Sequence, residues 1–284
     1  MDRRELLDAR RLGPLTNNLV RRSSETWGDL YPSCQGYADE CEALLEFIIE
    51  RGQFDRFLSR LTSRRQQRDE ALNEIRTAYL MESLGYPVVA WEPIDAAPYN
   101  VEFSVDLGAG FSPGYVEVKS PGWEGELTPE ERKAGRKDMD KYIDMEARAA
   151  SPVGKIRETV EKAARKFSGE FPSLLVILDD FFVSLGNWGW GPLQMALTSS
   201  TIAWGPGLFN DPQYITIGAV ALLWVKSVKP KGVEFHAICL DNPNVLPTAK
   251  LPPQLIKGLC TKLRMPTRDA PQQGSARLPS FIQP

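Results

Sequence analysis

The sequence predicts a mixed α/β fold on three observations. Residues 101–106 and 115–119 alternate apolar and polar side chains and flank a segment rich in Gly, Ser and Pro, which is typical of a β-hairpin. Residues 173–180 form a continuous apolar run of the kind that suits a strand buried on both faces. Apolar residues at helical spacing precede the hairpin and recur between it and that run, so helices and strands are expected along one chain.

The N-terminal part predicts a series of helices. Residues 41–52 and 53–61 carry apolar stripes, and a longer helix over 69–84 is closed by Gly85. A strand over 86–91 and a loop over 92–100 then lead into the hairpin. Arginines near the long helix are interpreted as solvated helix faces, with a phosphate-tracking patch as the alternative: Arg60, Arg64, Arg65 and Arg68.

The elements after the hairpin complete the α/β pattern. A capping box at residues 128–131 predicts a highly charged helix, expected as an exposed insertion. A second helix is predicted from Ser151-Pro152 through Phe167, and with the strands on either side it would form a right-handed βαβ unit. Residues 181–209 predict a long ordered loop, with a short helix within it as the alternative. The remaining predictions are strands over 214–226 and 232–240, a short helix over 253–263 and a mobile tail from residue 261.

Composition limits the partners of this chain. The 284 residues, 42% of them hydrophobic, suffice for one large domain or two small ones. The formal net charge of -3 gives no global basic signal, so nucleic-acid binding would depend on a local patch. The start, MDRRELLDARR, lacks the apolar core of a signal peptide, and the longest apolar run is too short to span a bilayer. We therefore expect a cytoplasmic protein with no membrane partner and with four reduced cysteines: Cys34, Cys41, Cys239 and Cys260.

The chain has a single histidine, His236, and this excludes several classes of enzyme. Ser-His-Asp and Cys-His hydrolases and two-histidine zinc proteases all need histidine in the site, and His236 lies in a strand pattern where we expect a structural role. Neither GxGxxG after a strand nor GxxxxGK[ST] occurs, so nucleotide-binding loops are unsupported. Catalysis would therefore depend on carboxylates, lysine and a metal ion.

The hairpin carries the residues for such chemistry. Alternation places Asp106, Glu117 and Lys119 on one face of the sheet. A loop over 107–114 would make Asp106 and Glu117 diagonal neighbours about 7 Å apart, close enough to hold one divalent cation. Two carboxylates and an ammonium on one patch can bind a metal ion and activate a water molecule. In the same register Glu102 faces Lys119, so a cross-strand ion pair on a solvated face is the alternative.

The order of helix, strand, Asp106-bearing strand, Glu117-Val118-Lys119 strand, helix and strand resembles the PD-(D/E)XK nuclease superfamily. The resemblance covers residues 65–180. It implies a restriction-endonuclease-like αβββαβ core with a mixed central sheet, an N-terminal helical extension and added C-terminal strands. The domains would then be a helical extension over 1–64, a nuclease-like domain over 65–260 and the tail over 261–284.

The resemblance also implies a site. In that family the acid of the second strand and the ExK of the third make a magnesium site, here Asp106, Glu117, the carbonyl of Val118, and Lys119. An accessory acid often comes from the first core helix, and Glu74 matches it through the pattern of Glu74, Ala78, Met81 and Gly85. A surface glutamate at that spacing is the alternative for Glu74. The family's proline before the strand acid is absent, because Val105 precedes Asp106.

The function implied by the resemblance is a nuclease dependent on Mg²⁺, or on Mn²⁺, that hydrolyses phosphodiester bonds. DNA is the expected substrate, and Lys119 would assist the attacking water. Two alternatives stay open. One is a non-catalytic interaction or structural module in which Glu102, Asp106, Glu117 and Lys119 form a charge network. The other is an RNA-cleaving, toxin-type nuclease with the same site, and a homo-oligomer or a partner protein is open in each case.

Overall fold

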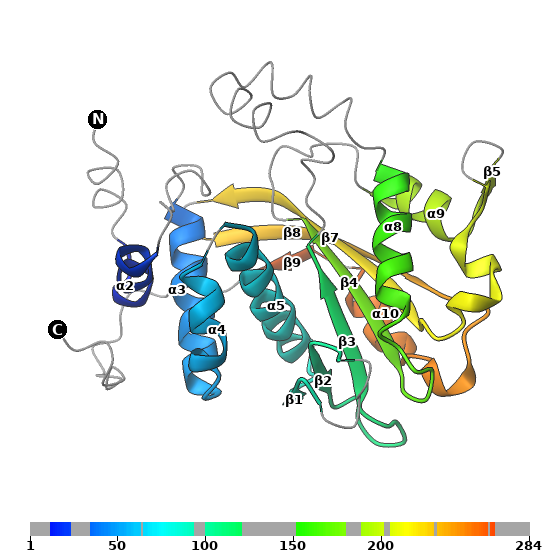
Figure 1. The fold of residues 1–284 in the computed structure, drawn as a ribbon, viewed down its shortest axis with the longest axis horizontal. Helices are drawn as coiled ribbons and strands as arrows, with labels where there is room; N and C mark the ends of the chain where they lie inside the picture. Colours follow the sequence, from blue (N-terminus) through cyan, green and yellow to red (C-terminus); the bar gives the residue numbers. More distant parts are fainter. Residues whose placement is uncertain are drawn as a thin grey trace, which may run out of the picture. The chain divides into compact units, whose positions relative to one another are not determined.

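The fold is described from a computed structural model, for residues 12–23, 35–63, 65–93, 100–120, 152–179, 189–201, 205–229, 232–260 and 262–264. It is a mixed α/β fold around a mixed sheet with the strand order β1-β2-β3-β4-β7-β8-β9 (Figure 1). The chain divides into two compact units, which are described in turn. Unit 1 contains residues 1–80, 225–235 and 262–284, and unit 2 contains 81–224 and 236–261.

Unit 1 is built on the predicted N-terminal helices, and the structure confirms them. Their apolar stripes are buried, as Leu44, Leu45 and Ile48 show. The long helix ends where Gly85 adopts a φ of 87°, a left-handed conformation that favours glycine. The helices are α2 (Pro14–Arg22), α3 (Gln35–Glu50), α4 (Phe54–Leu61) and α5 (Arg65–Ser83), the last of which continues into unit 2.

A buried carboxylate on α3 caps the N-terminus of α2. The Glu42 side chain accepts hydrogen bonds from the backbone N–H of Leu15 (3.0 Å), the backbone N–H of Thr16 (2.8 Å) and the Thr16 hydroxyl (2.8 Å). These bonds satisfy N–H groups that have no partner within the helix. A Cβ on Gly13 would lie 2.1 Å from the Glu42 carboxyl carbon, so this close approach requires glycine.

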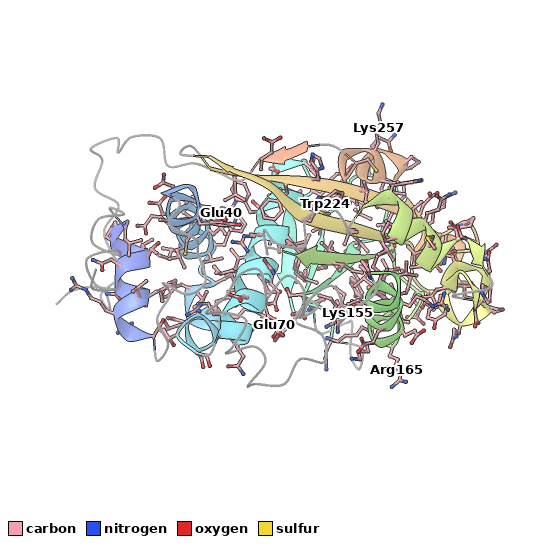
Figure 2. The ribbon with its side chains drawn as sticks, turned by 90° about the horizontal axis from the view of Figure 1, so that it is seen from above. Glu40, Glu70, Lys155, Arg165, Trp224 and Lys257 are labelled. Carbon is pink, nitrogen blue, oxygen red and sulfur yellow. The ribbon has the colours of Figure 1, made fainter. Side chains whose placement is uncertain are left out.

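A second buried charge pair links α3 to α5. The Arg76 guanidinium donates to Glu40 through Nε (2.8 Å) and Nη2 (3.0 Å), and Nη1 donates to the Asn73 amide oxygen (2.6 Å). Glu40 is labelled on α3 in Figure 2. The Arg76 guanidinium carbon also lies 5.9 Å from the ring centre of Phe235. Bidentate geometry of this kind compensates charges that are removed from water.

The arginines near α5 differ from the prediction of solvated helix faces. Arg68 is fully buried, so the prediction is wrong for this residue. Arg60 is partly exposed and binds Glu74. Arg64 and the side chain of Arg65 lie outside the described residues.

The sheet of unit 2 contains the predicted hairpin and the predicted buried strand. β1 is antiparallel to β2, and β2 to β3, whereas β3 is parallel to β4 and β4 to β7. The parallel pair β3–β4 confirms that the helix-containing connection is a crossover. The strands are β1 (Val88–Trp91), β2 (Phe103–Val105), β3 (Gly114–Lys119), β4 (Ser173–Asp179), β7 (Ala219–Lys229) and β8 (Gly232–Asp241). Strands β7 and β8 continue into unit 1, to which β9 (Lys262–Arg264), the last strand in the order, also belongs.

Helix α8 (Pro152–Ala164) contacts β3 and β4 and covers one face of the sheet (Figure 1). Its apolar stripe packs with side chains from β4 and β7 in one core, which also includes α9 (Trp190–Leu197). The helix ends at Ala164, before the predicted Phe167, because the N–H of Lys166 bonds the Ala163 carbonyl in a turn. That turn places Lys166 at the end of α8.

Two C-terminal predictions need correction. Residues 214–218 are not strand, because β7 begins at Ala219 and η4 (Pro212–Tyr214) precedes it. The helix predicted over 253–263 ends at Gly258, and residues 262–264 form β9. The shorter elements are β5 (Ser200–Thr201), β6 (Gly205–Pro206), η3 (Leu208–Asn210), η5 (Pro247–Ala249) and α10 (Pro253–Gly258).

Several predictions concern residues outside the described part of the chain. The charged helix after residue 128 and most of the predicted tail belong here, and so do residues 181–188 and 202–204 of the predicted long loop. Three of the unit boundaries, at 80/81, 224/225 and 235/236, fall within continuous elements, and the predicted domain boundaries at 64/65 and 260/261 stay predictions. Among the helices that the structure describes, none has the length and apolar character needed to cross a membrane.

Candidate functional site

The β2–β3 hairpin fixes which charged residues meet, and its register differs from the prediction. Ser104 pairs with Tyr115 and Phe103 with Val116, so Glu117 lies across from Glu102. The sequence prediction placed Glu117 opposite Ser104 and is therefore wrong by two residues. The loop is set by Val105, which pairs with Gly114 and leaves residues 106–113 as the turn.

Glu117 is the centre of the site. It lies on β3, and its neighbour across the parallel ladder is Leu175 of β4, which in turn pairs with Val220 of β7. Both neighbours belong to the apolar core on the α8 face. The Glu117 side chain is 0% exposed, so its charge is removed from water in the middle of an otherwise apolar row. An unpaired carboxylate in such a place would cost several kcal/mol.

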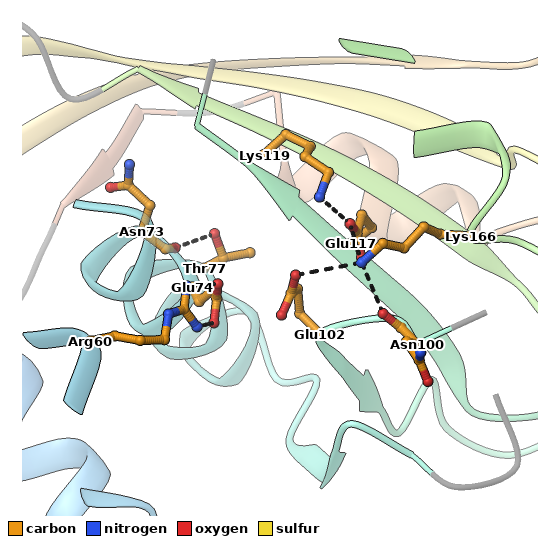
Figure 3. Close-up of polar contacts among 9 residues, drawn as sticks. All are labelled: Arg60, Asn73, Glu74, Thr77, Asn100, Glu102, Glu117, Lys119 and Lys166. Carbon is orange, nitrogen blue, oxygen red and sulfur yellow. Dashed lines mark hydrogen bonds and ion pairs between the residues drawn. The ribbon is translucent and has the colours of Figure 1, made fainter. Parts of the chain in front are cut away.

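Two lysines compensate this carboxylate, and both reach the same oxygen. Lys119 Nζ lies 2.5 Å from Glu117 Oε1, and Lys166 Nζ lies 3.0 Å from it (Figure 3). Lys119 follows Glu117 by two positions on the same face of β3, whereas Lys166 comes from the turn after α8. Within the described part of the chain, neither Glu117 oxygen accepts a hydrogen bond of regular geometry.

Lys166 connects Glu117 to a second acid, Glu102. The Lys166 ammonium lies 4.0 Å from Glu102 Oε1 and donates a hydrogen bond of 3.0 Å to the backbone carbonyl of Asn100. The Oε1 atoms of Glu102 and Glu117 therefore lie at most 7.0 Å apart, which is the sum of their distances of 4.0 Å and 3.0 Å to the Lys166 ammonium. Glu102 is 17% exposed and Lys166 31%, so water reaches one side of the cluster. We call Asn100, Glu102, Glu117, Lys119 and Lys166 the β3 charge cluster.

The β3 charge cluster can hold a cation between two carboxylates. Lys166 Nζ lies among three oxygen atoms, from Glu117, Glu102 and Asn100. Carboxylate and carbonyl oxygens are the ligands that Mg²⁺ and Mn²⁺ prefer in proteins. The ammonium therefore stands where a hard cation would find suitable donors, and the residues present fit a divalent ion.

The structure does not bring Asp106 to this cluster. Asp106 follows β2 and is exposed, and its Oδ1 accepts a hydrogen bond of 2.8 Å from the N–H of Gly108. It lies four residues from Glu102 along the chain, which corresponds to about 13 Å in extended backbone. The position of Asp106 is that of a side chain that closes a turn.

The other predicted site residues have separate places. Val118 lies between Glu117 and Lys119 on β3, with its side chain on the opposite face of the sheet. Glu74 belongs to unit 1, where it is buried and forms a two-bond ion pair with Arg60; the Nη1–Oε2 distance is 2.6 Å (Figure 3). Glu74 is thus engaged by an arginine within its own unit.

Sequence reasoning included Glu102 only in the charge-network alternative and not as a metal ligand, and it missed Lys166 altogether. Alternation already put Glu102 on the face of Glu117, but the wrong register assigned it to Lys119. Lys166 carried no signal, because only the folded turn after α8 brings it to β3. In the part of the chain that the structure describes, no group of three or more Asp, Glu, His or Cys side chains is placed to hold a metal, so the cluster offers two carboxylates and a carbonyl.

Three comparisons with known proteins, against family models, curated proteins and solved structures, each found no match.

Proposed function

We propose that this chain is a nuclease that uses a divalent metal ion, Mg²⁺ or Mn²⁺, to hydrolyse phosphodiester bonds, with DNA as the expected substrate. The observation that carries the proposal is the buried carboxylate of Glu117, which faces Glu102 across the hairpin and has Lys119 beside it. A charge kept in an apolar row is costly for stability, and such positions are enriched in functional sites.

The element order supports the same proposal. Among the described residues, helix α5 is followed by β1, β2 and β3, then by α8 and β4, which agrees with an αβββαβ core. The ExK sequence lies on the third of these strands, where the resemblance to PD-(D/E)XK nucleases expects it. The restriction-endonuclease-like fold is therefore part of the proposal, together with the site.

Each member of the cluster has a role in the proposed reaction. Glu117, Glu102 and the Asn100 carbonyl would hold the metal ion. The ion, when bound, lowers the pKa of water and offsets charge on the phosphate. Lys119, one third exposed at the rim, would orient the attacking water or compensate negative charge on the phosphate oxygens. No step needs histidine, in agreement with a chain whose single histidine is His236 of β8.

A non-catalytic module of the same fold is the second candidate, and one observation favours it. The four charged side chains of the cluster are two acids and two lysines, so the cluster is electrically balanced without a metal ion. In this case the cluster would only join β2, β3 and the end of α8. Cleavage and metal binding separate the two candidates.

We test the proposed function with purified protein, plasmid DNA and total RNA, each with Mg²⁺, with Mn²⁺ or with chelator. Metal-dependent cleavage is expected, and the preferred nucleic acid distinguishes a DNase from an RNA-cleaving enzyme. Glu117→Gln and Glu102→Gln should each lower the rate by more than about 100-fold, beyond the effect of most outer residues around a metal. Circular dichroism checks that each variant is folded.

Asp106→Asn is the matched control, because it changes an acid of the same hairpin outside the cluster. Near wild-type cleavage is expected for this variant. Loss of cleavage in Asp106→Asn with full activity in Glu102→Gln would return the site to the arrangement predicted from the sequence. Absence of cleavage under all conditions would favour the non-catalytic module.

A further inference from the structure

Lys166 occupies the position between the two acids of the cluster. Its ammonium has an oxygen of Glu117 at 3.0 Å, an oxygen of Glu102 at 4.0 Å and the Asn100 carbonyl oxygen at 3.0 Å. Three oxygen atoms from three residues around one positive nitrogen resemble the surroundings of a bound metal ion. Figure 3 shows these contacts converging on the Lys166 nitrogen.

A divalent ion and the ammonium cannot share this position. Both are cations, and two positive charges a few ångströms apart repel at a site that water reaches from one side only. The two carboxylates also repel each other, so the cluster is stable only with a cation between them. Binding of one cation therefore requires that the other leaves.

Lys166 has the freedom to leave. Its side chain is 31% exposed and starts from the turn after α8, so rotation of the flexible stem brings the ammonium into water. Glu117, by contrast, is fully buried on a central strand and stays in place. The Glu117 Oε2 atom accepts no hydrogen bond within the described residues, so a donor position is available to an incoming ion.

We propose that Lys166 is an internal competitor for the metal ion, so that metal binding and release of Lys166 from Glu102 and Glu117 are one exchange. This inference rests on the proposed metal site and explains what sets the affinity of that site for the metal ion. The lysine keeps the two acids together when metal is scarce, and the affinity for the ion is lowered by the strength of the lysine's own contacts.

The test measures Mn²⁺ affinity directly, without nucleic acid, by isothermal titration and by the spin-resonance signal of free Mn²⁺. Lys166→Met removes the competing charge and keeps most of the length of the side chain. It should bind Mn²⁺ at least about tenfold more tightly than the wild type, and Mn²⁺ should raise its melting temperature further. Lys166→Arg keeps a positive charge and should bind Mn²⁺ as weakly as the wild type.

Lys162→Met is the control, because Lys162 lies on α8 but is 70% exposed and pairs with Glu158 outside the cluster. Its Mn²⁺ affinity should equal that of the wild type. If Lys166→Met fails to fold, Lys166→Gln replaces it in the same measurement.

The outcomes separate this inference from the proposed function. Equal or weaker Mn²⁺ binding by Lys166→Met, with binding abolished by Glu117→Gln, would overturn the exchange and keep the metal site. No Mn²⁺ binding by the wild type or by any Lys166 variant would overturn both. Tighter binding by Lys166→Met without any nuclease activity would keep the exchange and overturn the nuclease.

Discussion

Glu117 shows at the scale of one residue how stability and function can oppose each other. Its neighbours in the row across the sheet, Leu175 and Val220, are fully buried apolar side chains. A leucine at position 117 would continue this row, and the two lysines could turn toward water because each is about one third exposed. The carboxylate is therefore expected to serve something other than stability.

We predict that Glu117→Leu leaves the free energy of unfolding unchanged or raises it by about 1 to 2 kcal/mol, because apolar replacement of buried ion pairs is often neutral or stabilising. Urea unfolding at pH 7 measures this. A loss of about 3 kcal/mol or more would instead show that the cluster holds the fold together, as the non-catalytic module requires.

Cys41 of α3 gives a prediction about pH. Burial raises the pKa of its thiol from 9.0 to about 12. Above about pH 9 the unfolded thiol ionises while the folded thiol keeps its proton. The contribution of this thiol to the free energy of unfolding is therefore fully present below pH 9 and is lost as the pH rises toward 12. The loss is about 1.4 kcal/mol per pH unit within that window.

Between pH 8 and pH 10.5, the wild type should lose about 2 kcal/mol more than Cys41→Ala, as measured by urea unfolding at both values. Parallel curves for Cys41→Ala and the wild type would contradict the prediction.

For single residues, the sequence predicted the face of the sheet on which a side chain lies but not the residue that it contacts. Alternation along the hairpin correctly placed Glu102, Glu117 and Lys119 on one face. The register of the hairpin depends on its turn. Asp106 accepts a hydrogen bond from the Gly108 N–H and therefore belongs to the turn. The alternation of apolar and polar residues does not predict where the turn begins. The contact of Lys166 with Glu117 joins residues far apart in the chain, and only the folded structure reveals it.

Elements followed their sequence patterns where a periodic or continuous apolar pattern extends over the whole element. Helices α3, α4 and α5 and strand β4 lie where apolar spacing predicted them. The segment 214–218 deviates because side chains take its backbone bonds. Ser173 donates to the Thr216 carbonyl and accepts from the Gly218 N–H, and Asn242 donates to the carbonyls of Tyr214 and Ile217. A segment whose backbone is satisfied in this way does not need a strand partner.

Helix α2 yields a prediction about an element, because Glu42 of α3 caps its first turn. Glu42→Ala removes the acceptor of three hydrogen bonds and should cost about 1 to 3 kcal/mol. The loss should be concentrated in α2, with faster hydrogen exchange at the amides of Leu15 and Thr16. Glu50→Ala, at the exposed end of α3, should leave both amides protected.

Unchanged exchange at Leu15 and Thr16 in Glu42→Ala would show that other contacts hold α2 against α3. Gly13→Ala is a second way to disturb this cap, since the added Cβ would overlap the Glu42 carboxylate. It should accelerate exchange at the same two amides.

For the whole molecule, the sequence predicted the mixed α/β class and the succession of elements around the hairpin, and the structure confirms these. Strand order and direction needed the structure, since the pairing of β4 with β7 joins segments separated by a helix and several turns. The specific fold family and the activity stay proposals.

The overall charge gives a prediction about nucleic-acid binding. With 34 basic and 37 acidic residues, the molecule does not attract a polyanion at long range. Binding of DNA by Glu117→Gln, in chelator to prevent cleavage, should therefore depend weakly on salt, with a slope of about -1 to -3 in log affinity against log salt. A slope steeper than about -5 would reveal an extended basic surface, and Arg64 and Arg65 would be the first residues to replace.

The sole histidine of the chain also has a spectroscopic consequence. His236 lies with its ring at 82° to that of Trp224, with ring centres 5.3 Å apart, and Trp224 is labelled on β7 in Figure 2. One imidazole gives one set of proton resonances, which the indole ring current displaces from the values of a free histidine. A ¹H spectrum would therefore report on the contact between Trp224 of β7 and His236 of β8 during folding or ligand binding, without isotope labels or resonance assignment.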